Sequence, residues 1–252
     1  MCHFTRGIIL INIAQITDPH ISPDDTKRYG IDNRSRFLKT LSNIKKYGVD
    51  LLVITGDMAL SNGELESYIW LRKQLDEYNF NYITIPGNHD NAQLMLKIMH
   101  DIDINIDSEY YFYKDFDNHR LVFMDSSNNI ISKDQLLWLK DLNDNSINDI
   151  SVFVHHPLDY GNCVFMDSKY PLENIREVKE LLIKCKKIKH VFSGHYHTGK
   201  EYEIGHVKQF IAPSTWFQLD TVSKDFKMDS KNFGWLQIKL NKNDLETKIH
   251  YL

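Results

Sequence analysis

Short apolar runs rich in β-branched residues alternate along the chain with segments in which apolar residues recur at helical spacing. The short runs predict buried strands at residues 8–16, 50–55, 81–85, 152–154 and 190–192. The helical spacing predicts helices through residues 37–44, 65–78, 132–142 and 175–182, and a short helix from about residue 91. Residues 110–113 and 120–124 are expected to form adjacent strands, and three further strands are expected at 207–211, 233–240 and 245–251. This alternation predicts an α/β fold in which helices cover the strands.

Two helix boundaries have local signals of their own. Gly48 is placed to end the first helix, and Ser132 with Gln135 forms a capping-box pattern at the start of another. The chain contains no internal repeat, low-complexity tract or linker, so residues 1–252 are expected to form a single domain.

Composition indicates a globular protein that does not bind nucleic acid. The hydrophobic share of 42% and the charged share of 25% are those of an ordinary globular protein, which argues against disorder. A formal net charge of −4 offers no net attraction to a polyanion, so nucleic acid is not an expected partner.

The apolar run over residues 7–14 follows Arg6 and could be mistaken for part of a signal peptide. It is too short to span a bilayer, no small-residue cleavage site follows it, and cutting there would remove the first strand. The three cysteines form no even disulfide framework, which favours a reducing compartment. We therefore expect a cytoplasmic protein without a membrane partner.

Polar residues that bind metals gather where the predicted strands end. Five strands are each followed at once by such a group: Thr17-Asp18-Pro19-His20, Thr55-Gly56-Asp57, Pro86-Gly87-Asn88-His89-Asp90, Val154-His155-His156-Pro157 and Ser193-Gly194-His195-Tyr196-His197. In sheet-and-helix proteins, ligands bind beyond the carboxyl ends of the strands. The five groups are therefore expected to converge on one site.

Each group taken alone has an ordinary structural explanation. Asp-x-His is most often a chance pairing or a helix cap, Gly-Asp after a strand is often a turn, and a lone histidine near a strand usually makes a structural hydrogen bond. Five such groups in one chain, each at a strand end, are hard to obtain by chance. Glycine before Asp57, Asn88 and His195 would let the backbone approach the site without a Cβ clash.

The residue types point to transition metals. Neutral imidazole, carboxylate and amide oxygen together suit Fe, Mn, Zn or Co, whereas an all-oxygen set would suggest Mg or Ca. Two ions about 3.5–4 Å apart and joined by a bridging carboxylate can polarise a phosphoryl group and share an acidified water.

The order of these motifs resembles the calcineurin-like binuclear metallophosphoesterases, and every motif of that family is complete. The resemblance implies a β-sandwich of two mixed sheets flanked by helices and two bound metal ions whose bridging hydroxide attacks a phosphate ester. It assigns Asp18, His20, Asp57 and His197 to the first ion, and Asp57, Asn88, His155 and His195 to the second. It also places His89 off the metals as the proton donor or electrostatic stabiliser, with the substrate phosphate facing His20, Asp57, Asn88, His89 and His197.

Roles are also expected for Asp90 and for the adjacent pair His155 and His156. Asp90 is expected either to orient the His89 imidazole or to cap the following helix. Successive side chains leaving a strand point to opposite faces and Pro157 restricts His156, so His155 and His156 are not expected to reach the same metal. The resemblance, whose motif has its ligand two residues before proline, implies that His155 binds metal, which leaves His156 a structural histidine bonded to a backbone carbonyl.

Similarity to one branch of the family extends over nearly the whole chain. Residues 123–126, 135–139, 160–163 with 166–167, 212–215 with Gln218, and 234–235 resemble the bacterial class III 3′,5′-cyclic-AMP phosphodiesterases. The chain departs from that pattern at Leu158-Asp159, where a second proline is common, and in the glycine-poor segment 126–132. Both departures are expected near the rim of the cleft, and the role of segments 126–132 and 158–172 in specificity stays open.

The leading hypothesis is hydrolysis of a cyclic nucleotide, 3′,5′-cAMP to 5′-AMP, with a small nucleotide or phosphodiester as the only expected partner. A broad phosphomonoesterase or phosphodiesterase with the same two-metal core is the alternative enzyme. A non-catalytic interaction module with the same fold would be expected to lack some ligands, whereas all seven positions and His89 are present. Oligomeric state and metal identity are not encoded in any recognisable pattern.

Overall fold

The computed structural model describes residues 11–105, 108–116, 119–241 and 244–252. The apolar run at the start of the chain forms strand β1 (Ile11–Ile16), and the first residues of the predicted strand, 8–10, lie outside the described residues. The expected strands and helices are all found in the described part of the chain, with ends shifted by a few residues.

Strands fall into two large mixed sheets and one small one. The other strands are β2 (Leu51–Thr55), β3 (Tyr82–Ile85), β4 (Phe112–Phe116), β5 (His119–Phe123), β6 (Asp149–Phe153), β7 (Ile188–Ser193), β8 (Lys200–Ile204), β9 (Val207–Ile211), β10 (Gln218–Leu219), β11 (Met228–Ser230), β12 (Gly234–Asn241) and β13 (Asp244–Tyr251). One sheet has the order β13-β12-β1-β2-β3, another has β4-β5-β6-β7-β9-β8, and β10 pairs with β11 alone. The neighbouring strands β1, β2 and β3 are parallel to one another, as are β5, β6, β7 and β9.

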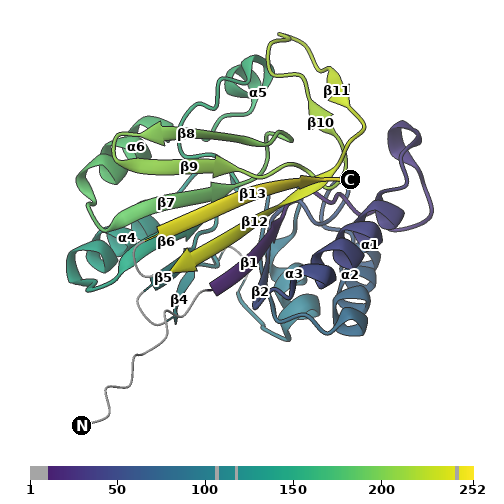
Figure 1. The fold of residues 1–252 in the computed structure, drawn as a ribbon, viewed down its shortest axis with the longest axis horizontal. Coiled ribbons are helices and arrows are strands. Elements are labelled where there is room, and N and C mark those ends of the chain that lie inside the picture. The colour runs from purple at the N-terminus through teal and green to yellow at the C-terminus, as the bar shows by residue number, and fades with distance from the viewer. Residues whose placement is uncertain (1–10, 106–107, 117–118, 242–243) are drawn as a thin grey trace.

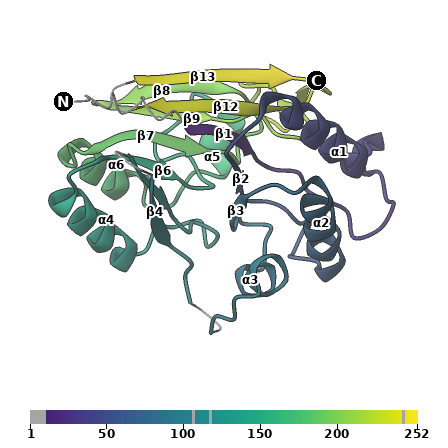
Figure 2. The same ribbon diagram turned by 60° about the horizontal axis from the view of Figure 1, so that its bottom comes forward.

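Helices cover the outer faces of the two sheets, as Figures 1 and 2 show. The α-helices of the described residues are α1 (Asn33–Ile44), α2 (Leu65–Tyr78), α3 (Ala92–His100), α4 (Lys133–Asn145), α5 (Val164–Lys169) and α6 (Ile175–Lys184). Apolar residues of α1, α2 and α3 pack with one face of the β1–β3 sheet, and those of α4 and α6 pack with one face of the β5–β7 sheet. The predicted fold of two mixed sheets flanked by helices is confirmed.

The inner faces of the two sheets share a buried apolar core. Its most regular part is a row of stacked phenylalanines, one from each of five neighbouring strands, with ring centroids 4.8, 5.4, 5.0 and 5.2 Å apart: Phe112, Phe123, Phe153, Phe192 and Phe210. These rings are direct cross-strand partners, so side-chain pairing holds the register of the sheet. The core thereby keeps the strand ends in fixed positions.

Local helix signals act as predicted, with one difference. Gly48 adopts a left-handed conformation at φ 57° and ends the first helical segment after a 3-10 turn. Ser132 accepts a hydrogen bond from the Gln135 backbone N–H, but the Gln135 side chain bonds both backbone groups of Asp125 instead of closing the capping box. The buried Gln135 amide therefore ties α4 to the end of β5.

Candidate metal centre

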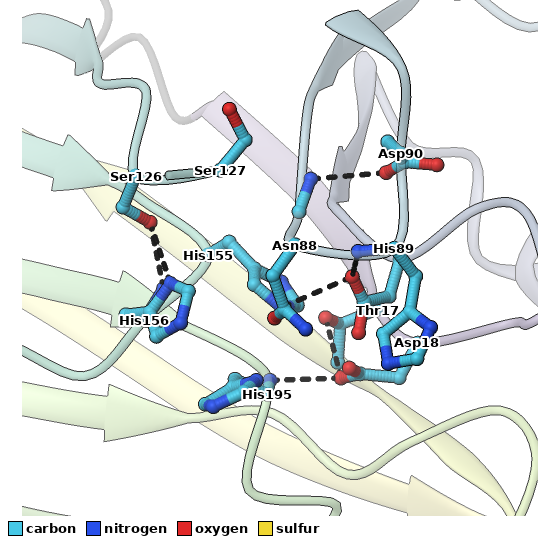
Figure 3. Close-up of polar contacts among 12 residues, drawn as sticks. Thr17, Asp18, Asn88, His89, Asp90, Ser126, Ser127, His155, His156 and His195 are labelled. Carbon is cyan, nitrogen blue, oxygen red and sulfur yellow. Dashed lines mark hydrogen bonds and ion pairs between the residues drawn. The ribbon is translucent and has the colours of Figure 1, made fainter. Parts of the chain in front are cut away.

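All five predicted groups of polar residues lie together in space. They follow β1, β2 and β3 of one sheet and β6 and β7 of the other, so they meet at the carboxyl ends of strands along the seam between the sheets. Figure 3 shows the side chains of these loops pointing toward one another. This is the convergence that the strand-end pattern predicts.

One cluster is formed by Asp18, His20 and His197. The His197 Nε2 atom lies 3.4 Å from Asp18 Oδ1 and 3.2 Å from His20 Nε2. Two imidazole nitrogens this close are compatible with a shared proton or with a cation between them.

A second cluster is formed by Asp57, His155 and His195. The His155 Nε2 atom lies 3.4 Å from Asp57 Oδ1 and 3.1 Å from Asn88 Oδ1. The amide oxygen of Asn88 is thus directed at the same point as the carboxylate and the imidazole.

Asp57 touches both clusters through different oxygens. Its Oδ1 faces His155, while its Oδ2 lies 3.6 Å from His20 Nε2. A carboxylate in this position is suited to bridge two cations, which is the role that the resemblance implies for Asp57.

The outward-facing nitrogens of three of these histidines contact backbone carbonyls. His155 Nδ1 lies 2.8 Å from the Thr55 oxygen, His20 Nδ1 lies 3.4 Å from the Leu60 oxygen, and His195 Nε2 lies 3.0 Å from the Tyr170 oxygen. An N–H donated to a carbonyl fixes the ring so that its other nitrogen faces the cluster, where it can bind a metal once it carries no proton. The loops therefore set the ring orientations before any ion binds.

Protonation states also suit metal binding. Burial lowers the pKa of His20 to about 3 and, helped by the charge of His155, that of His195 to about 4. Burial favours protonation of Asp18, but His197 outweighs it and lowers the pKa of Asp18 to about 2. At neutral pH, these groups are neutral imidazoles and an ionised carboxylate, the forms that bind metal.

His155 differs from the other histidines. Burial works against its charged form, but the adjacent Asp57 carboxylate outweighs burial and raises the pKa of His155 to about 9. A cation that binds at the second cluster must displace this proton, so binding there releases a proton.

A buried oxygen of Asp18 also indicates that the site is built to hold cations. Asp18 is fully buried, and its Oδ1 accepts no hydrogen bond among the described residues and faces His197 Nε2 at 3.4 Å, although its Oδ2 accepts from Thr17 Oγ1 and the His195 N–H. A buried carboxylate oxygen without a donor is costly unless a cation meets it.

Backbone strain is concentrated at the same residues. Positive φ angles, uncommon for non-glycine residues, occur at five of the seven predicted ligands: Asp18, His20, Asp57, His195 and His197. Such conformations cost on the order of 1–3 kcal/mol each and collect at functional sites.

All three predicted glycines are needed for close approach, as Gly56 and Gly194 illustrate. A Cβ on Gly56, which has φ 91°, would lie 2.5 Å from His155 Nδ1, and a Cβ on Gly194 would overlap the Thr17 hydroxyl. Both positions therefore exclude any side chain.

Comparison with known proteins agrees with this geometry. The family model of the calcineurin-like phosphoesterases matches residues 11–199, three quarters of the chain. The chain belongs to the calcineurin-like phosphoesterases. The resemblance predicted from the motifs is confirmed, and a binuclear metal centre is the common property of this family.

Similar proteins cover almost the full length of this phosphoesterase. A probable cyclic nucleotide phosphodiesterase of Fibrobacter succinogenes is 33% identical, with 96% of this chain and 94% of that protein covered. A 3′,5′-cyclic adenosine monophosphate phosphodiesterase of Haemophilus influenzae is 26% identical, with 92% of this chain and 86% of that protein covered. Among solved structures, a dimetal phosphatase from Danio rerio shares the fold with a TM-score of 0.66 at 12% identity, covering 95% of this chain and 98% of that one.

His89 of this phosphoesterase lies beside the clusters. Its ring centroid is 4.9 Å from that of His20, its Nδ1 lies 3.1 Å from the Ser61 carbonyl oxygen, and its backbone N–H donates to Asp57 Oδ1. A ring nitrogen of His89 is also near enough to His20 and Asp57 for metal ligation, so distance alone does not separate a ligand from a proton donor.

Both expectations for Asp90 were wrong. The α3 helix is capped by the side chain of Asn91, and no bond joins the Asp90 carboxylate to the His89 ring, which contacts Ser61. Asp90 instead accepts hydrogen bonds from the backbone N–H groups of Gly87, Met58 and Ala59 and from the Tyr68 hydroxyl. It therefore joins the loop that carries Asp57 to the loop that carries Asn88 and His89 (Figure 3).

His156 lies outside the two clusters. Its Nδ1 is 2.9 Å from the Ser126 hydroxyl, not from a backbone carbonyl as expected, and its ring packs 4.1 Å from that of His195. Figure 3 shows His156 and Ser126 set apart from Asp18 and His89. His156 thus supports the ring of His195 from behind.

The chain has Leu158-Asp159 where the related phosphodiesterases commonly have a second proline, and this difference has a structural reason. The Leu158 N–H donates to Gln209 Oε1, a bond that proline could not make, and Asp159 pairs with Lys179 at 2.6 Å. The segment after His156 is therefore anchored by polar contacts in place of a second proline.

A cavity of about 370 Å³ opens above the clusters. All five residues predicted to face the phosphate line it, together with His195, while Phe165, Met166 and Tyr170 of segment 158–172 contribute to its wall. No residue of segment 126–132 is among the lining residues, although that segment was expected near the rim. One side of this cavity is aromatic and was not predicted from the sequence, because its residues lie in no metal motif: Tyr29, Trp216, Phe217 and Phe226.

Proposed function

We propose that this chain is a metal-dependent cyclic nucleotide phosphodiesterase that converts 3′,5′-cAMP to 5′-AMP. The observation that carries the proposal is the pair of ligand clusters sharing Asp57 at the floor of a cavity of nucleotide size. Similarity over nearly the full length of proteins named as cyclic nucleotide phosphodiesterases supports the substrate. Free, buried Cys163 and Cys185 support action in the cytoplasm, and no described helix is long and apolar enough to cross a membrane.

We assign the ligands as the motifs predict. Asp18, His20, Asp57 and His197 would hold one ion, and Asp57, Asn88, His155 and His195 the other. Two transition-metal ions bound there, drawn from Fe, Mn, Zn or Co, would polarise the phosphoryl group and supply an acidified water.

The protein groups orient the substrate around these ions. Asn88, His20 and His197 line the cavity floor, so a phosphate that binds there lies against them. The Asp90 bridge holds the Asn88 loop and the Asp57 loop at a constant separation. This arrangement presents the phosphorus atom in one orientation.

His89 is assigned to the leaving oxygen. Its Nδ1 is held by the Ser61 carbonyl, so the ring edge that carries Nε2 is directed into the cavity it lines. In its doubly protonated form, the ring would donate Nε2–H to the ribose oxygen as the P–O bond breaks.

His89→Ala is expected to lower kcat for cAMP by roughly 10²–10⁴-fold, the usual effect of losing a general acid or a charge-stabilising donor. Metal content should stay near that of the wild type. Elemental analysis beside the rate measurement checks both, with His206→Ala as a matched control because the His206 ring contacts the Cys185 carbonyl far from the site. Loss of an ion from His89→Ala would identify His89 as a ligand.

The proposed function is tested by rates on one metal-loaded preparation with cAMP, a bis-ester and a phosphomonoester. We expect hydrolysis of cAMP to 5′-AMP, two ions per chain, loss of activity on chelation, and recovery with Mn or with Fe(II) and Zn. Cleavage of the monoester alone would contradict the cyclic nucleotide substrate and favour the broad phosphomonoesterase. Saturation of the active enzyme at one ion per chain would contradict the two-metal centre.

A further inference from the structure

Four aromatic side chains from two distant parts of the chain form one side of the cavity: Tyr29, Trp216, Phe217 and Phe226. We call them the aromatic wall. Tyr29 belongs to the connection between β1 and α1, and the other three lie in and around the β10–β11 hairpin, at the top of Figure 1. The Tyr29 ring centroid lies 5.5 Å from that of Trp216, 5.8 Å from Phe217 and 5.8 Å from Phe226.

The inner end of the aromatic wall packs against two of the predicted ligand histidines. Trp216 lies 4.9 Å from the His20 ring and Phe217 lies 4.9 Å from the His197 ring. Tyr29 and Phe226 continue outward from these two. The aromatic surface therefore runs from the phosphate end of the cavity toward its opening.

Burial divides the wall into two parts. Trp216 and Phe217 are 5% and 3% exposed, as expected for rings that support the site. Tyr29 and Phe226 are 45% and 46% exposed, although their rings are nearly parallel at 28° and line the same cavity. Packing therefore leaves nearly half of each of these two side chains exposed.

The backbone at Tyr29 is strained. Tyr29 and Gly30 have φ angles of 58° and 69°, and the Ile31 N–H bonds the Arg28 carbonyl, so the four residues form a turn of type I′ character. Asparagine, aspartate or glycine normally occupies the position of Tyr29, because a bulky side chain disfavours positive φ. A tyrosine held there against its backbone preference points to a role for its ring.

We propose that Tyr29 and Phe226 form the subsite for the base of the cyclic nucleotide. This inference rests on the proposed function. A nucleotide whose phosphate lies on the metal clusters extends its base along the aromatic wall, where a planar heterocycle covers the exposed ring faces. Recognition by stacking accepts any base, because every base has a π face.

The test compares two substrates that differ only in the base: cAMP and 1-O-methylribose 3′,5′-cyclic phosphate. For Tyr29→Ala and for Phe226→Ala, we expect kcat/KM for cAMP to fall roughly tenfold or more, mainly through KM. The value for the base-free substrate should stay within about twofold of the wild type, since the metal clusters are untouched. Tyr29→Phe keeps the ring, so its kcat/KM for cAMP should stay close to that of the wild type.

Tyr113→Ala is the matched control, because Tyr113 is also 45% exposed and also has an arginine beside its ring, but lies on β4 away from the cavity. Tyr113→Ala should have the wild-type kcat/KM for both substrates. Equal losses on both substrates in the Tyr29 and Phe226 variants, or no loss on either, would overturn the base subsite. A wild type that cleaves the base-free substrate as efficiently as cAMP would overturn it too. Failure of the wild type to hydrolyse both cyclic phosphates would instead contradict the proposed function.

Discussion

Asp57→Asn is expected to lower the rate of phosphodiester hydrolysis by more than roughly 10⁴-fold, beyond the range for loss of one general acid. The two Asp57 oxygens face different clusters, Oδ1 toward His155 and Oδ2 toward His20. Asparagine keeps the size of the side chain but has only one oxygen, and its NH₂ group would face one of the cations. The variant therefore loses the bridge between the two ions.

Metal content distinguishes this explanation from misfolding. Asp57→Asn should retain at most one ion per chain by elemental analysis, with a far-ultraviolet circular dichroism spectrum like that of the wild type. Asp125→Asn is the control, because Asp125 is also a buried aspartate but bonds Tyr110 and Ser127 outside both clusters. Two ions in Asp57→Asn with normal activity would show that Asp57 does not bridge.

His155→Ala and His156→Ala are expected to differ sharply although the two residues are adjacent. His155 Nε2 faces Asp57 and Asn88, whereas the His156 ring turns to Ser126 and lies behind His195. His155→Ala should lose the second ion, because only three of the four protein ligands remain at that position. Its activity should fall by more than roughly 10³-fold.

His156→Ala should retain both ions and lose no more than about tenfold in rate. Its larger effect should be on stability, since removing a fully buried side chain leaves a cavity. Metal titration and thermal unfolding of both variants measure these effects. Depletion in His156→Ala together with full occupancy in His155→Ala would reverse the assignment.

The sequence alone was sufficient to locate the strands and the polar groups that follow them. Buried strands such as Leu51–Thr55 are continuous apolar runs, and their ends are marked by glycine and by metal-binding residue types. These signals are local, so they need no knowledge of neighbouring segments. Residue-by-residue comparison with the family motifs then supplied the ligand assignments, which stay predictions.

Contacts between distant segments could not be read in the same way. The sequence offered two roles for Asp90, but the carboxylate bonds Met58 and Ala59 from another loop, and the neighbouring Asn91 takes the helix cap. Likewise, the pattern indicated that His156 is structural without showing that Ser126 would be its partner.

The aromatic wall was decided by the tertiary structure alone. Tyr29 and Phe226 lie in loops without periodicity or a motif, so neither has a local signal of function. They meet because Ser214 and Thr215, just before β10, bond the backbone carbonyls of Asp18 and Thr17 after β1, which brings the β10–β11 hairpin beside the connection to α1. Local patterns determine which segments become strands and where their polar ends lie, whereas the packing of two sheets determines which remote side chains share a cavity.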